Sequence, residues 1–112
     1  MKKPNIIFYF TDQQRWDTMG CYGQRLNTTP NLDRIAAEGC RFDNAFTCQP
    51  VCGPARACLQ TGLWPTQTGC FRNDIEIPRN VPTLAGALNA AGYQVLDTEI
   101  KGEWSAIAAR NI

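Results

Sequence analysis

The sequence of 112 residues predicts one small domain of the α/β class. A continuous apolar, β-rich run at residues 5–10 is typical of a parallel strand that is buried on both faces. Three later segments combine a helix-start signal with apolar residues at helical spacing. Strand and helix patterns therefore alternate along the chain, as they do in layered α/β proteins.

The first half of the chain continues from this strand into a loop and a helix. Residues 13–28 are polar and punctuated by glycine, which predicts a loop with at most a short helical turn. Thr29 and Pro30 predict a helix start, because Thr caps a helix N-terminus and Pro fits its first turn. Gly39 predicts the end of that helix. Residues 40–47 alternate well enough to predict a second strand.

The second half contains two more helix patterns. One is predicted from about residue 54 to 61, with Gly62 as its stop. Residues 63–80 carry Gly, Pro and Thr with little periodicity, which predicts a loop. The Val-Pro-Thr sequence at residues 81–83 predicts the start of the other helix, and residues 93–96 suit a further strand.

The composition restricts the binding partners and the cellular compartment that we expect for this protein. A net charge of +1 predicts no strong attraction to nucleic acid or to membranes. The apolar run at residues 6–10 is too short for the core of a signal peptide, and no segment approaches the length of a membrane span. We therefore expect a cytoplasmic protein without a nucleic-acid or membrane partner.

Six cysteines raise the questions of disulfides and of zinc. An even number fits a disulfide framework, but no secretory signal supports one. A structural zinc site usually shows paired cysteine spacing or histidines, and this chain has irregular spacing and no histidine. We expect most of these thiols to be small buried apolar groups. The cysteines are Cys21, Cys40, Cys48, Cys52, Cys58 and Cys70.

The motif Cys52-Gly53-Pro54-Ala55-Arg56 is the most informative part of the sequence. Pro54 favours a helix start, and Arg56 follows Cys52 by about one helical turn, so both side chains can face one site. The helix N-terminus adds unpaired N–H groups and positive partial charge, which suit an oxyanion. The alternatives are an inert buried thiol beside a solvated arginine, or a thiol that acts directly as a nucleophile. Direct thiol catalysis is disfavoured, because the spacing to Arg56 does not match the anion loop of cysteine phosphatases.

Asp12 and Gln13 follow the first strand directly. In open α/β sheets the ligand lies beyond the carboxyl ends of the strands, so these two residues stand where a site is expected. Two adjacent oxygen donors suit a hard cation such as Ca²⁺. The alternative is that they are polar residues at a strand end with nothing to bind. Two residues cannot supply the six to eight oxygen ligands that calcium prefers.

The C-x-P-x-R motif resembles the signature of type I sulfatases. Four upstream segments also resemble that family in order and spacing, so the resemblance covers roughly residues 4–94. It implies the N-terminal portion of an alkaline-phosphatase-like α/β/α sandwich with a mainly parallel sheet. The upstream segments are residues 5–17, 19–23, 29–34 and 39–46.

The resemblance also implies roles for individual residues. Cys52 would be the precursor of formylglycine, the catalytic nucleophile of the family. A formylglycine-generating or anaerobic sulfatase-maturing enzyme would recognise Pro54 and Arg56 in the extended chain. Asp12, Gln13 and the converted Cys52 would contact Ca²⁺, or Mg²⁺ or another divalent cation in its place, and Arg56 would help to hold the nucleophile. Many sulfatases have Asp at the position of Gln13, and Gln is a recognised variant there.

The reaction implied by the resemblance is the hydrolysis of a small-molecule or carbohydrate sulfate ester. One hydroxyl of the hydrated formylglycine attacks sulfur and displaces the alcohol. The other hydroxyl then loses its proton, sulfate leaves and the aldehyde returns. In the family, histidines transfer protons and lysines bind the sulfate, whereas this chain has no histidine.

The chain diverges from the family after residue 94. Lys101 and Trp104 are out of register with the Lys-Trp-His segment that the family carries next. We therefore expect residues 4–94 to be part of a sulfatase catalytic domain and residues 95–112 to be a divergent end. This chain alone is expected to be incomplete and inactive. The alternatives are a catalytically inactive truncated remnant, or a phosphonate or phosphate ester hydrolase of the same superfamily.

Overall fold

The computed structural model describes residues 3–100 and 104–111. The chain divides into two compact units. One comprises residues 13–46, and the other comprises the residues before and after that segment. Within the part of the chain that the structure describes, none of the helices combines the length and the apolar character that crossing a membrane requires.

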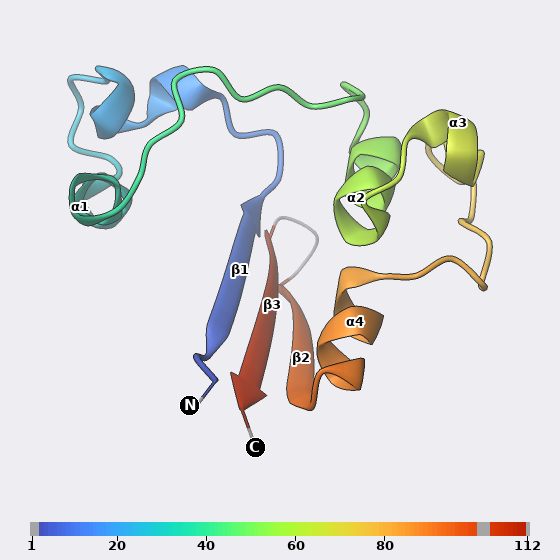
Figure 1. Ribbon diagram of the computed structural model, residues 1–112. Helices are drawn as coiled ribbons and strands as arrows, with labels where there is room; N and C mark the ends of the chain where they lie inside the picture. Colours follow the sequence, from blue (N-terminus) through green and yellow to red (C-terminus); the bar gives the residue numbers. More distant parts are fainter. Residues whose placement is uncertain (1–2, 101–103, 112) are drawn as a thin grey trace. The chain divides into compact units, whose positions relative to one another are not determined.

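A sheet of three strands organises the larger unit (Figure 1). The strands are β1 (Ile6–Thr11), β2 (Tyr93–Ile100) and β3 (Trp104–Asn111), in the order β1-β3-β2. Both neighbours pair antiparallel with β3, so β1 and β2 run in the same direction with β3 between them. The α/β class is as expected, but the sheet is not mainly parallel. Residues 104–111, for which no strand was predicted, form the strand that separates the other two.

Strand β1 is covered on one face only. Alternate side chains of a strand point to opposite faces. Phe8 and Phe10 share one face, are half-buried and stack with their ring centroids 6.3 Å apart. Ile7 and Tyr9 on the other face are 77% and 52% exposed. The prediction of a strand buried on both faces is therefore wrong, and one exposed face is common in antiparallel sheets.

Three helices complete this unit. They are α2 (Cys52–Thr61), α3 (Pro65–Thr68) and α4 (Leu84–Ala90). Helix α2 contacts α3 and α4, and α4 also contacts β2. The stop predicted at Gly62 is confirmed, since Gly62 adopts the left-handed conformation with φ 68°. Helix α3 lies in the segment predicted as a loop, because four residues are too few to show a period.

The buried side chains gather around the motif helix. Pro54 and Ala57 lie on α2, Pro65 and Thr68 on α3, and Cys70 just beyond α3. Of the other side chains that the structure describes, only Ala109 in β3 is equally buried. The C-x-P-x-R motif is therefore anchored in the best-packed part of the chain.

The unit of residues 13–46 contains α1 (Pro30–Glu38) and two short 3₁₀ turns, η1 (Trp16–Thr18) and η2 (Gly20–Tyr22). The helix bounds predicted from Thr29-Pro30 and Gly39 are confirmed. The strand predicted at residues 40–47 is wrong: this segment has no regular structure. Its aromatic residues have no sheet to pack against, and Phe46 is 91% exposed.

Candidate active site around the motif helix

Helix α2 begins at Cys52, two residues before the predicted start. The preceding residue, Val51, is extended, and Pro54 occupies the third helical position. Pro is tolerated there, because the N–H groups of the first turn have no partner within the helix. Pro54 is fully buried, whereas Cys52 is exposed. The thiol therefore lies at an accessible helix N-terminus, where the helix dipole favours anions.

Arg56 and Asp12 form an ion pair, although 44 residues separate them along the chain. Nη2 of Arg56 lies 3.3 Å from Oδ1 of Asp12, and both side chains are about two-thirds buried. The guanidinium also lies over the ring of Phe10, 5.1 Å from its centroid. The structure thus brings together two residues that the sequence analysis assigned to the site on separate grounds.

Asn73 approaches the start of α2 from the loop after α3. Its Oδ1 accepts a hydrogen bond from the Cys52 thiol at 3.3 Å and one from the backbone N–H of Gly53 at 2.9 Å. Sequence reasoning missed this residue. An asparagine in a loop of Gly, Pro and Thr carries no signal that it reaches a cysteine 21 residues earlier.

Gln13 begins the other unit and is exposed. Its φ of 51° lies in the left-handed region, which is uncommon for residues other than glycine. Among the residues that the structure describes, no group of three or more His, Cys, Asp or Glu side chains is placed to hold a metal ion. Asp12 and Gln13 alone therefore do not complete a calcium shell of six to eight oxygens.

The six cysteines are all free thiols. Only Cys70 is buried, so the expectation that most of them are buried is wrong. Partial burial raises the pKa of the Cys58 thiol to about 11, and the neighbouring Cys48 thiol contributes to that shift. Cys58 therefore stays protonated at neutral pH and is a poor nucleophile, although it shares helix α2 with Cys52.

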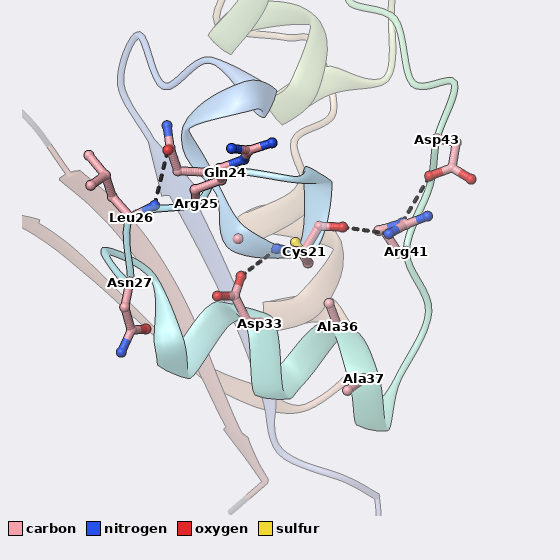
Figure 2. A pocket seen from close by; sticks show the side chains of 11 residues that line it. Cys21, Gln24, Arg25, Leu26, Asn27, Asp33, Ala36, Ala37, Arg41 and Asp43 are labelled. Carbon is pink, nitrogen blue, oxygen red and sulfur yellow. Dashed lines mark hydrogen bonds and ion pairs between the residues drawn. The ribbon is translucent and has the colours of Figure 1, made fainter.

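The unit of residues 13–46 has an open pocket of its own, which contains none of the motif residues (Figure 2). Asp33 of α1 accepts a hydrogen bond from the backbone N–H of Cys21 at 2.7 Å. Arg41 donates to the carbonyl of Cys21 and pairs with Asp43 at 2.9 Å. Asp33, Arg41 and Asp43 thus contact other groups of the same unit, which accounts for these residues without a ligand.

Comparison with known proteins gives a consistent result. A sequence model of the sulfatase family matches residues 4–106. The chain is 42% identical over 104 residues to an uncharacterised sulfatase, YidJ, of Escherichia coli, covering 93% of this chain and 20% of that protein. It is also 42% identical over 107 residues to an N-acetylglucosamine-6-O-sulfatase of Bacteroides thetaiotaomicron, covering 96% of this chain and 19% of that protein.

Mammalian sulfatases are similar over the same segment. Bovine arylsulfatase A is 38% identical over 107 residues, which are 90% of this chain and 20% of that protein. The chain thus spans about a fifth of the length of the curated relatives it matches. No solved structure matches the chain.

Proposed function

The chain belongs to the sulfatase family, and we propose that it supplies the nucleophile of a sulfuric ester hydrolase, formed by conversion of Cys52 to formylglycine. The overall reaction consumes a sulfate ester and water and releases an alcohol and sulfate. We further propose that residues 4–94 are part of an alkaline-phosphatase-like catalytic domain and that residues 95–112 are a divergent end.

The ion pair between Arg56 and Asp12 is the observation that carries this proposal. One partner comes from the C-x-P-x-R motif and the other from the carboxyl end of β1, which is where α/β proteins build their sites. A solvated helix arginine would not need a partner 44 residues away. The pair therefore favours a shared site over the two residues being unrelated surface groups.

Conversion of Cys52 is an oxidation that needs a maturing enzyme. In net terms, the thiol and water give the aldehyde, hydrogen sulfide, two protons and two electrons. Both electrons pass to an oxidant that the maturing enzyme supplies, such as dioxygen in a formylglycine-generating enzyme. Pro54 and Arg56 would serve as recognition residues before folding, since Pro54 is buried afterwards.

The chain's own residues would then orient the reaction. The N-terminus of α2 and the guanidinium of Arg56 supply positive charge for the sulfate oxygens. Asp12 and Phe10 restrict the guanidinium, which lowers the cost of ordering it when substrate binds. The same electrostatics would serve a phosphate or phosphonate ester, but the names of the relatives favour sulfate.

We further propose that Asp12 and Gln13 are two ligands of a divalent cation, Ca²⁺ or alternatively Mg²⁺, with the converted residue 52 as a third. Carboxylate and amide oxygens are the donors that these hard cations prefer. Among the residues that the structure describes, no cluster of three or more His, Cys, Asp or Glu side chains supplies the remaining ligands. The cation would supply additional positive charge for the sulfate group.

The substrate class follows from the relatives by analogy. The Bacteroides protein is named for N-acetylglucosamine 6-O-sulfate, and two relatives of Formosa agariphila are named for ulvan. We propose a sulfated carbohydrate as the substrate, and a maturing enzyme as the protein partner. We propose no nucleic-acid or membrane partner, in line with the net charge of +1.

A chimaera tests the proposed function. Residues 4–94 would replace the matching segment of the Bacteroides sulfatase, in a strain that expresses a formylglycine-generating enzyme. Sulfate release from 6-O-sulfated N-acetylglucosamine and from an aryl sulfate should depend on Cys52, and an aryl phosphate should react more slowly. A folded, converted chimaera that hydrolyses none of these esters, or that keeps its rate after Cys52→Ala, would reject the proposal.

A further inference from the structure

The contact between Asn73 and the start of α2 defines the orientation of the asparagine amide. A backbone N–H can only donate, so the atom of Asn73 that faces Gly53 must be the acceptor, Oδ1. The same oxygen faces the Cys52 sulfur at 3.3 Å. One fixed acceptor therefore serves both the backbone of the helix start and the side chain at residue 52.

The loop that carries Asn73 is held by buried groups. The Cys70 thiol, 2% exposed, donates to the carbonyl of Ile75 at 3.3 Å. The Cys70 backbone N–H donates to Oγ1 of the buried Thr68 at 3.3 Å. Asp74 takes a left-handed conformation with φ 64°, which turns the chain directly after Asn73. These contacts fix both sides of the turn, so Asn73 is presented to α2 by an anchored loop.

The fit at the helix start is close. A Cβ added to Gly53 would lie 2.8 Å from Oδ1 of Asn73, closer than real Cβ atoms approach. Val51, at the N-cap position, makes no side-chain capping bond. Asn73 therefore fills the capping role from outside the helix, by accepting from the N–H of the second helical residue.

We propose that Asn73 is a positioning residue that favours the hydrated form of formylglycine at residue 52. The inference rests on the proposed conversion of Cys52. Hydration adds water across the aldehyde: the carbonyl carbon gains a hydroxyl, and the carbonyl oxygen gains a proton. The diol has two O–H donors, whereas the aldehyde has none. A fixed acceptor beside residue 52 therefore stabilises the diol selectively, and it orients one of the two hydroxyls.

The test measures the ratio of hydrate to aldehyde in the full 112-residue chain. The chain would be labelled with ¹³C at the cysteine β-carbons and converted by a co-expressed formylglycine-generating enzyme. Carbon NMR separates the two forms of residue 52, because a diol carbon and an aldehyde carbon resonate far apart. Asn73→Leu should lower the ratio by about two- to tenfold, the range expected for the loss of one hydrogen bond.

Two further variants separate positioning from a general structural effect. Asn73→Asp keeps an oxygen acceptor and should retain at least the wild-type ratio. Asn80→Leu changes an exposed asparagine elsewhere in the loop and should also leave the ratio unchanged. If Asn73→Leu does not fold, Asn73→Asp still tests the proposal. A lower hydrate fraction in folded Asn73→Asp than in the wild type would overturn it.

The outcomes distinguish the two proposals. If wild-type Cys52 carries no formylglycine, the proposed function fails, and the role of Asn73 fails with it. If residue 52 is converted but folded Asn73→Leu has the wild-type hydrate ratio, only the role of Asn73 is overturned. A lowered ratio in Asn73→Leu, restored in Asn73→Asp, supports both.

Discussion

The region around α2 and the unit of residues 13–46 are held together in different ways. Around α2, side chains are buried, and the polar contacts join residues 21 and 44 positions apart. In residues 13–46 no side chain is buried, and the hydrogen bonds of Asp33 to Cys21 and Thr29 and of Arg41 to Cys21 join residues 4 to 20 positions apart. The residues proposed for chemistry thus lie mainly where packing fixes their positions. Substitutions near α2 should alter the site, and matched substitutions in residues 14–46 should not.

The largest expected difference is in sulfate ester turnover, between this chain alone and the chimaera that contains its residues 4–94. The converted chain should show no turnover of an aryl sulfate with calcium present. It has no histidine to protonate the leaving alcohol, and general acid catalysis contributes roughly a hundredfold or more in rate. Sulfate release by purified chain, compared with Cys52→Ala, is the measurement. Multiple turnovers that depend on Cys52 would contradict this expectation.

Arg56→Ala should have the next largest effect. Loss of a positioned cation beside the sulfate should lower the kcat of the chimaera by on the order of a hundredfold. The rate would be divided by the formylglycine content, because Arg56 is also proposed to guide conversion. Arg34→Ala, an exposed arginine of α1, is the matched control from the other unit and should leave the normalised rate within about twofold. Equal losses in both variants would remove the distinction between the regions.

A smaller effect is expected for the reactivity of the Cys58 thiol, which lies on the motif helix α2 itself. Because its pKa is raised to about 11, the Cys58 thiol remains protonated where a free thiol begins to ionise, and the thiolate is the reactive form. Its alkylation by iodoacetamide at pH 8.5 should be on the order of tenfold slower in the folded chain than in urea. In the folded chain the rate should go on rising with pH up to about 11, whereas in urea it should level off at a lower pH. Equal rates in the folded and unfolded chain would contradict the raised pKa of this thiol.

The smallest effect is the coupling within ion pairs. A double-mutant cycle on Asp12 and Arg56 should give about 0.5–1 kcal/mol of unfolding free energy, since the pair is partly buried. The pair of Arg15 and Asp17 in the other unit is more exposed, at 77% and 38%, and should give close to zero. Urea unfolding measures both cycles. A larger coupling in the exposed pair would reverse the comparison.

The parts of the fold that the sequence predicts correctly depend on local signals. Thr83 caps α4 by accepting from the N–H of Gly86 at 3.1 Å, as a Thr before a helical period suggests. Gly39 and Gly62 end their helices for similar local reasons. The order of the sheet could not be read in this way, because the pairing of β3 with β1 joins residues about a hundred positions apart.

The same distinction holds in the candidate site. Cys52, Pro54 and Arg56 form a motif that local spacing makes visible, and Asp12 follows a recognisable strand. Asn73 depends on how the turn after α3 is anchored by Cys70 and Thr68. The residues around Asn73 give no sign that its Oδ1 lies 3.3 Å from the Cys52 sulfur. Only the structure could therefore identify Asn73 as part of the site.

The most direct test of the account is the mass of the tryptic peptide that contains residue 52. The chain would be co-expressed with a formylglycine-generating enzyme, alongside a sulfatase that is known to be converted. We expect the peptide to lose the mass that separates a thiol from an aldehyde, to react with an aldehyde-specific probe, and to do neither in Cys52→Ala. Fragment ions should assign the change to residue 52 and not to Cys48, which lies on the same tryptic peptide, and peptides with the other four cysteines should be unchanged. An unmodified Cys52 peptide, under conditions that convert the control sulfatase, would contradict the central claim.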